Sequence, residues 1–189
     1  RLAHDRDEPD APCTLIAKFH NPNPAPRAIA EGFDMYRREV RFYQQGLEGI
    51  DVATPRCYHA DWAKGGYCVL LLQDMAPARS GGWERDDLAQ LAEVVVRAVA
   101  PLHAAWWEHP SLSQLDWPLR GDAPSMLASQ EASANGWERF LRITEGVLPS
   151  SLDDVVRRVA RSFVDELARL WSRSPRTLFH YDCHWDNLC

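Results

Sequence analysis

Short strand-like runs occur in the first 73 residues of this chain, whereas most of the remainder has the apolar periodicity of helices. The apolar runs at 13–19, 52–59 and 67–72 are rich in strand-forming residues and are separated by glycine, proline and polar residues. From residue 88 onward, apolar residues recur every three or four positions, which is typical of amphipathic helices. Strands and helices that are segregated along the chain in this way indicate an α+β fold.

One long helix is predicted inside the strand-rich part. From Ile29 to Leu47, apolar side chains recur at spacings of three and four residues, which places them on one stripe of a helix. The preceding stretch at 21–26, NPNPAP, is predicted to be neither helix nor central strand, because each proline lacks an N–H group and restricts the residue before it. Gly46 and Gly49 are expected to end the helix.

The second part of the chain is predicted to be mostly helical. Its first helix contains Pro101, where a kink is expected because an interior proline removes a backbone hydrogen bond. A connector rich in Pro and Gly lies at 76–82. We therefore predict a small lobe at 1–76, a hinge near 73–79 and a helical lobe at 77–189. The helices of this lobe are predicted at 88–106, 125–144 and 151–171, and one short strand is predicted at 176–180.

The composition excludes some classes of protein. The chain has 189 residues and a formal net charge of −6, so a basic surface that binds nucleic acid is not expected. Its five cysteines are scattered without a C-x-x-C pair. This pattern fits neither a disulfide framework nor a structural zinc site, and it indicates a reduced, cytoplasmic setting. The longest apolar stretches are far too short to span a bilayer.

Lys18 and Glu39 are the first candidates for chemistry. Lys18 lies in the middle of an apolar strand, where an ammonium group is costly to bury without a partner; the ordinary explanation is an outward-facing position on a half-exposed strand. Glu39 lies on the edge of the apolar helical stripe, where it could meet a strand lysine or pair with Arg37 or Arg38. A strand lysine followed by a helix glutamate is the order in which kinases place the ion pair that orients ATP.

The strongest signal is a polar run near the end of the sequence. His180, Asp182, His184, Asp186 and Asn187 fall within eight residues, directly after an apolar segment. The H-x-D pattern followed five residues later by Asn has the spacing of the kinase catalytic loop, in which Asp is the base and Asn binds magnesium. Two other interpretations are open. One is a metal cluster built on the first three of these residues, and the other is a plain loop rich in turn-forming residues.

The segment 179–187, FHYDCHWDN, resembles the H-G-D-x-H-x-x-N signature of aminoglycoside phosphotransferases and their choline-kinase-like and ecdysteroid-kinase-like relatives. Four more segments resemble the same group in the same order: the strand lysine in LIAKF, the helix glutamate in AEGFDMYRREVRFY, the hinge in VLLLQDMAPAR and a helix at LHAAWW. The resemblance implies a two-lobed, protein-kinase-like α+β fold. The chain is expected to be a fragment of that fold, truncated at both ends.

The resemblance also implies how a nucleotide would be bound. Lys18 would contact the nucleotide phosphates, and Glu39 would orient Lys18. Backbone groups of Gln73 and Met75 at the hinge would hold the purine of ATP or GTP.

At the loop, the resemblance implies that Asp182 is the catalytic base and that Asn187 binds Mg²⁺. His180 and His184 would support the loop. Tyr181 stands where the family has glycine, so it adds bulk beside the catalytic Asp. The family's second metal-binding Asp follows this loop and is expected beyond residue 189, so the chain as given is expected to turn over little.

The predicted function is the transfer of a nucleotide γ-phosphoryl group to a hydroxyl of a small molecule, with Mg²⁺ as cofactor. The sequence does not specify the acceptor. Two alternatives are open: a pseudo-kinase module that binds nucleotide without catalysis, which Tyr181 favours, and a metal-dependent hydrolase that uses His180, Asp182 and His184. Neither a nucleic-acid partner nor a membrane span is expected.

Overall fold

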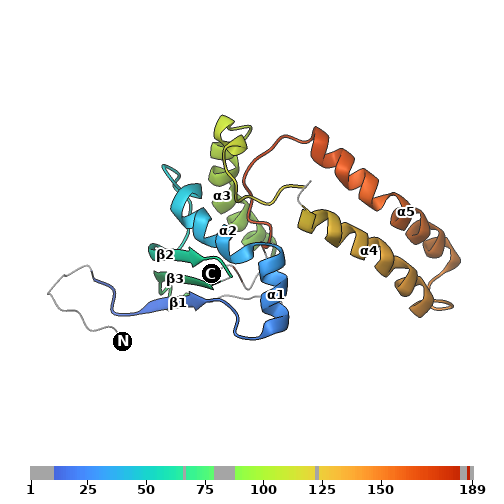
Figure 1. Ribbon diagram of the computed structural model, residues 1–189. Coiled ribbons are helices and arrows are strands. Elements are labelled where there is room, and N and C mark those ends of the chain that lie inside the picture. Colours follow the sequence, from blue (N-terminus) through green and yellow to red (C-terminus); the bar gives the residue numbers. More distant parts are fainter. Residues whose placement is uncertain (1–10, 66, 79–87, 122–123, 184–186, 188–189) are drawn as a thin grey trace. The chain divides into compact units, whose positions relative to one another are not determined.

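The computed structural model describes residues 11–65, 67–78, 88–121, 124–183 and 187. They form a mixed α+β structure with a small antiparallel sheet, which confirms the predicted α+β class (Figure 1). The chain divides into two units. The first is Arg1–Pro118 together with Arg176–Cys189, and the second is Leu119–Pro175. The predicted lobe boundary near residue 76 stays a prediction.

The sheet has three strands in the order β1–β3–β2. Strands β1, Leu15–Phe19, and β2, Cys57–Ala63, both pair antiparallel with the central strand β3, Tyr67–Gln73. Lys18 of β1 lies opposite Leu70 of β3, and directly paired residues point to the same face of a sheet. β2 begins at residue 57 rather than at the predicted residue 52, after a proline that lacks the N–H group a ladder requires.

Two helices replace the single helix that the apolar stripe predicts. Helix α1 spans Pro24–Gly32, and helix α2 spans Met35–Arg41. The break lies at Asp34, whose φ of 54° is left-handed, a conformation that Asp tolerates better than most residues. The prediction of no helix at 21–26 is also wrong in part. Pro24 and Pro26 lie in the first turn of α1, where a missing N–H group costs no helical hydrogen bond.

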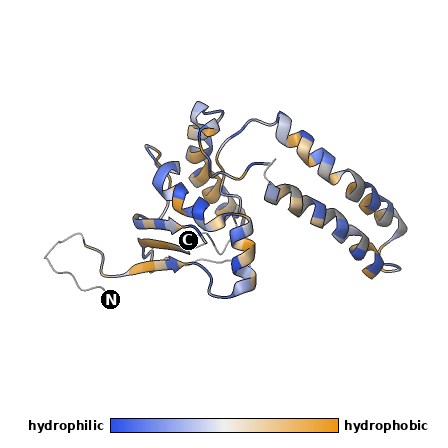
Figure 2. Ribbon diagram, in the orientation of Figure 1, coloured by the Kyte–Doolittle hydropathy of each residue, from blue (hydrophilic) through white to orange (hydrophobic). Residues whose placement is uncertain are grey.

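The core of the first unit lies between α2 and one face of the sheet. Val40 of α2 is buried together with Leu70 and Leu72 of β3. Figure 2 shows the apolar character of β1 and β3. Because Lys18 shares a face with Leu70, the packing of α2 on this face brings the helix over the lysine. Partly buried side chains surround the cluster: Tyr43, Cys57, Ala60, Trp62 and Cys68.

α2 continues directly into a π-helical turn, Phe42–Gly46. This helical segment therefore ends at the first of the two glycines that are predicted to stop it. Helix α3 spans Leu88–Trp106 and contains Pro101, as the sequence predicts. A short 3₁₀ helix, Pro110–Ser113, follows α3.

The segment predicted to be a strand at 176–180 is not one. The N–H group of Glu108 donates to the Arg176 carbonyl at 2.7 Å, and the Thr177 hydroxyl donates to the His103 carbonyl at 2.8 Å. Arg176 and Thr177 therefore bond to Glu108, two residues after the end of α3, and to His103 within α3, rather than to a strand of the sheet. Leu178 is buried, which anchors the segment that leads into the predicted catalytic loop.

The second unit is a helical hairpin of α4, Pro124–Ile143, and α5, Ser150–Arg173 (Figure 1). Both helices lie within two residues of their predicted bounds. None of the helices in the described part of the chain is long and apolar enough to cross a bilayer.

Replacement of Leu70 by Ala is expected to lower the free energy of unfolding of the first unit by about 2–4 kcal/mol, because truncation leaves a cavity between α2 and the sheet. Leu70 is 1% exposed. Leu71→Ala is the matched control, since Leu71 is the next residue of β3, points to the opposite face and is only partly buried. It should cost about half as much or less. Chemical denaturation measures both variants, and equal losses would contradict a core confined to the α2 side of the sheet.

Candidate functional site

An ion pair joins Lys18 of β1 to Glu39 of α2. The structure therefore brings the two residues together. Arg37, one of the two arginines that could have paired with Glu39, pairs with Asp34 and Asp116. The Lys18 and Glu39 side chains are 49% and 38% exposed. An ion pair at this exposure contributes about 0–1 kcal/mol to stability. Its main physical effect is to fix the position of the Lys18 ammonium.

Two side chains lie within electrostatic reach of this pair. Burial raises the pKa of the Cys68 thiol; the Glu39 carboxylate raises it further, whereas the Lys18 ammonium lowers it. Burial also raises the pKa of Tyr43 to about 12, with smaller contributions from Glu39 and Cys57. Both groups are therefore neutral at pH 7, so Lys18 and Glu39 are the charged groups in this cluster.

The predicted hinge follows β3 directly. The N–H group of Gln73 donates to the Arg56 carbonyl at 2.8 Å, and the Arg56 N–H donates to Gln73 Oε1 at 3.2 Å. The Met75 carbonyl accepts from Ala78 N–H at 2.9 Å. Gln73 is the last residue of β3, and Met75 follows it by two residues. The backbone groups of these two residues are the ones that the resemblance places against a purine.

The predicted catalytic loop contains a tight turn at Tyr181. The N–H group of Asp182 donates to the His180 carbonyl at 2.8 Å, and Tyr181 between them has a φ of 65°. This geometry is that of a γ-turn with positive φ, which is rare and strained for a residue with a side chain. The left-handed conformation explains why glycine suits this position. The γ-turn also changes the direction of the chain sharply immediately before Asp182.

Asp182 and Asn187 contact one another. The Asn187 side-chain N–H₂ group donates to the Asp182 carbonyl at 2.9 Å and to Asp182 Oδ2 at 3.1 Å. The five-residue spacing seen in the sequence thus corresponds to a direct contact. Because Asn187 Nδ2 is directed at Asp182, its Oδ1 is the atom that could bind a cation.

The chemistry of these two residues fits Mg²⁺, which prefers carboxylate and amide oxygens and keeps several waters. Asn187 would supply one ligand beside the Asp182 carboxylate. Among the described residues there is no cluster of three or more His, Cys, Asp or Glu side chains that could hold a metal ion. His184, which the metal-hydrolase alternative needs, lies outside the described residues, as does Asp186.

Arg38 of α2 is a partly buried charged residue. Burial lowers the pKa of its guanidinium, and the Asp34 carboxylate raises it. The Nε atom of Arg38 is buried without a hydrogen-bond partner in the part of the chain that the structure describes. Sequence reasoning considers Arg38 only as a partner of Glu39. The burial of its guanidinium depends on tertiary contacts, for which no local pattern exists.

A separate pocket of about 150 Å³ lies among α1, α2, β2 and the β2–β3 turn. Its two acidic groups, Glu31 and Asp34, pair with Arg27 and Arg37. Their charges are therefore balanced within the protein. Neither Lys18 nor Asp182 lines this pocket, so it is not part of the candidate site.

A glycine at position 181 is expected to be more stable than an alanine there by about 1 kcal/mol. The left-handed conformation costs an L-residue about 1–2 kcal/mol, and the greater unfolded-state freedom of glycine offsets part of this gain. Tyr181→Gly and Tyr181→Ala both remove the ring, so their difference isolates the backbone conformation. Chemical denaturation of the two variants is the measurement. An alanine variant as stable as the glycine variant would show that φ at this position is not positive in solution.

Comparison with protein-family models, with curated proteins and with solved structures finds no match to this chain. The roles of the site residues therefore rest on two supports. One is the geometry of the Lys18–Glu39 and Asp182–Asn187 contacts, and the other is the resemblance of short segments to the phosphotransferase signature.

Proposed function

We propose that this chain is part of a two-lobed, kinase-like phosphotransferase that transfers the γ-phosphoryl group of ATP or GTP to a hydroxyl of a small molecule. The observation that carries the proposal is the ion pair between Lys18 on a strand and Glu39 on a later helix, two residues that are 21 positions apart. Kinases use such a pair to place a lysine on the nucleotide phosphates. Since both side chains are 38–49% exposed, the pair contributes little to the stability of the fold.

The nucleotide would lie along the edge strand β1, on the exposed border of the sheet face that packs against α2. Ile16 is two residues before Lys18 and shares its face, so it offers an apolar surface to a purine ring. Beyond it, the Gln73 carbonyl and the Met75 N–H supply one acceptor and one donor two residues apart. Adenine and guanine each present a donor and an acceptor side by side on their pairing edge, so this backbone pattern accepts either purine.

Asp182 would act at the other end of the nucleotide as the general base for the acceptor hydroxyl. Its carboxylate is braced by the Asn187 amide at 3.1 Å, which limits its rotation. Bound Mg²⁺ would neutralise charge on the transferring phosphate. Phosphoryl transfer depends mainly on positioning and charge stabilisation, so a braced base and a fixed ammonium are the parts that the reaction requires.

A non-catalytic nucleotide-binding module is the second candidate. Tyr181 favours it, because a bulky side chain in a strained left-handed conformation stands immediately before the proposed base. In such a module the Lys18–Glu39 pair would still hold phosphates. Binding would then occur without transfer to any hydroxyl.

Nucleotide binding tests the proposal through the two lysines of the chain, Lys18 and Lys64. Lys18→Met is expected to weaken Mg·ATP and Mg·GTP binding by about tenfold or more, because a charge-assisted contact with phosphate is lost. Lys64→Met is the matched control and should bind as the parent chain does, since Lys64 lies in the β2–β3 turn. Isothermal titration calorimetry measures both. Equal affinity in the two variants, or no binding by the unaltered chain at millimolar nucleotide, would refute the proposed site.

In the full-length parent protein, which would carry the second metal-binding Asp, Asp182→Asn is expected to lower transfer by about 10²–10⁴ with nucleotide affinity unchanged, because the carboxylate acts on the acceptor. The measurement is ADP release in the presence of aminoglycosides, choline and sterol-like alcohols. Unchanged turnover in this variant would contradict a base at Asp182. Binding of Mg·ATP without ADP release for any acceptor would instead support the non-catalytic module.

A further inference from the structure

We propose that α2 is held in the orientation that pairs Glu39 with Lys18 by two attachments to residues 106–117, and that Arg37 and Trp117 are positioning residues for the phosphate-binding lysine. The inference rests on the proposed function of Lys18. The attachments lie before and after Glu39 along the helical segment, and they join residues that are far apart in the sequence.

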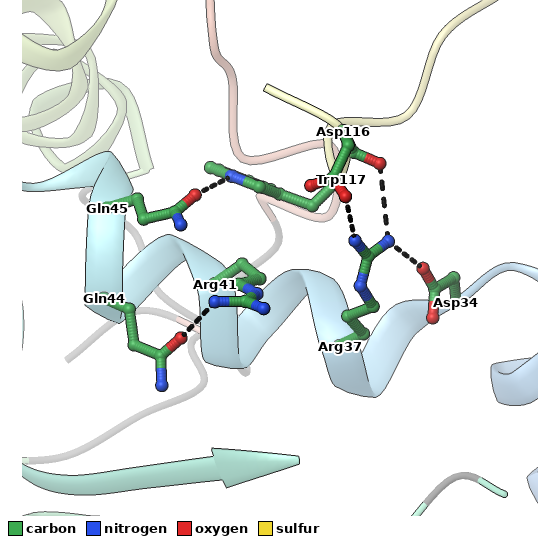
Figure 3. Close-up of polar contacts among 7 residues, drawn as sticks. All are labelled: Asp34, Arg37, Arg41, Gln44, Gln45, Asp116 and Trp117. Carbon is green, nitrogen blue, oxygen red and sulfur yellow. Dashed lines mark hydrogen bonds and ion pairs between the residues drawn. The ribbon is translucent and has the colours of Figure 1, made fainter. Parts of the chain in front are cut away.

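The first attachment is made by Arg37, two residues before Glu39 (Figure 3). Its Nη2 donates to Asp116 Oδ2 at 2.6 Å, and its Nη1 contacts the Asp116 carbonyl at 3.4 Å and Asp34 Oδ2 at 3.1 Å. The Arg37 guanidinium also lies over the Trp62 ring of β2, 5.7 Å from its centroid. Only 18% of the Arg37 side chain is exposed. A planar guanidinium with several partners fixes direction as well as distance.

The second attachment lies in the π-helical turn that follows α2. Trp117 is buried, and its Nε1 donates to Gln45 Oε1 at 2.7 Å (Figure 3). Trp106, at the end of α3, donates from Nε1 to the Gly46 carbonyl at 3.0 Å. A Cβ at position 46 would lie 2.7 Å from the Phe42 ring and 3.4 Å from Trp117, so glycine permits this close approach.

The two attachments constrain rotation of α2 about its axis. Arg37 and Glu39 are about 160° apart around a helix, so fixing the arginine fixes the direction of the glutamate. Gln45 and Gly46 are held six and seven residues after Glu39, which prevents the other end of the segment from swinging. An exposed ion pair is weak by itself. The Lys18–Glu39 contact therefore depends on the helix being placed by other contacts.

A merely structural role for these contacts predicts a different behaviour. In that case, loss of these contacts lowers the melting temperature of the unit. The Lys18 ammonium stays paired with Glu39 at 25 °C as long as the unit is folded. In a positioning role, their loss frees the Lys18 ammonium in the folded protein. The reactivity of the lysine amine separates the two, because an amine in an ion pair is acylated more slowly than a free one.

The experiment is acylation of the folded chain with N-hydroxysuccinimidyl acetate, followed by peptide mass spectrometry. The chain has two lysines, so Lys64 serves as an internal reference for Lys18. Glu39→Gln defines the fully released state. Arg37→Gln and Trp117→Phe are each expected to raise the Lys18-to-Lys64 ratio by about fivefold toward that state, since each removes one hydrogen-bonded attachment.

Two control variants change residues of the same types. Arg41→Gln changes an arginine one turn along α2 whose bond to Gln44 stays within the helical segment (Figure 3). Trp107→Phe changes a tryptophan that is 57% exposed. Both should leave the acylation ratio unchanged. A ratio that stays at the parent value in Arg37→Gln and Trp117→Phe, while Glu39→Gln raises it, overturns the inference; so does a ratio that Glu39→Gln does not raise.

A double variant distinguishes this inference from the proposed function. In the Glu39→Gln background, Arg37→Gln should add no further acylation, because the pair is already lost. An additive increase would show that Arg37 acts on Lys18 by another route and would overturn the positioning role. Lysine acylation uses no nucleotide, so failure of Mg·ATP to bind refutes the proposed function without changing the acylation result. If both hold, the loss of Mg·ATP affinity in Arg37→Gln should follow its acylation ratio.

Discussion

The packing of α2 on one face of the sheet is the constraint on which the candidate site depends. Val40 is buried against Leu70 and Leu72, and this contact sets the distance between helix and sheet. Lys18 pairs in register with Leu70, and Glu39 is the residue before Val40, so both charged groups lie at the border of the same apolar contact. The ion pair is thus a consequence of strand register and helix placement. Its own strength is small because both side chains are half exposed.

The second half of the site is local in origin. Asp182 and Asn187 are five positions apart, and the Asn187 amide contacts the Asp182 carboxylate and carbonyl. The γ-turn at Tyr181 determines the direction in which the chain enters Asp182. The extended residues before it are anchored by the bond from Thr177 to the end of α3 and by the buried Leu178. A short, strained loop on an anchored segment is a common way to hold a catalytic group, since the surrounding contacts compensate for the strain.

How far the sequence predicts this structure depends on the range of the interactions. The bounds of α3 follow from its periodic apolar stripe, and the contact of Lys18 with Glu39 follows from their order on a strand and a helix. The break at Asp34 is hidden because the apolar stripe continues across it. The segment at 176–180 has strand composition, but its described backbone and hydroxyl bonds run to His103 of α3 and to Glu108, which follows α3.

The contacts that place α2 could not be predicted in the same way. Arg37 and Asp116 are separated by 79 positions, and Gln45 and Trp117 by 72. Neither residue pair belongs to a motif. In the sequence alone, the charged residues resemble ordinary surface residues, and the tryptophan resembles an ordinary core residue. The left-handed conformation of Tyr181 is the exception, since the glycine of the phosphotransferase signature marks a position where positive φ is favoured.

In the proposed function, Lys18 and Asp182 act on one nucleotide. The most direct measurement is a crystal structure of the chain with Mg²⁺ and a non-hydrolysable ATP analogue. The account predicts a phosphate within hydrogen-bonding distance of Lys18 Nζ, with Asn187 Oδ1 near the metal and the Asp182 carboxylate facing the terminal phosphate. An analogue bound elsewhere, with the ammonium and the carboxylate on unrelated surfaces, would contradict it.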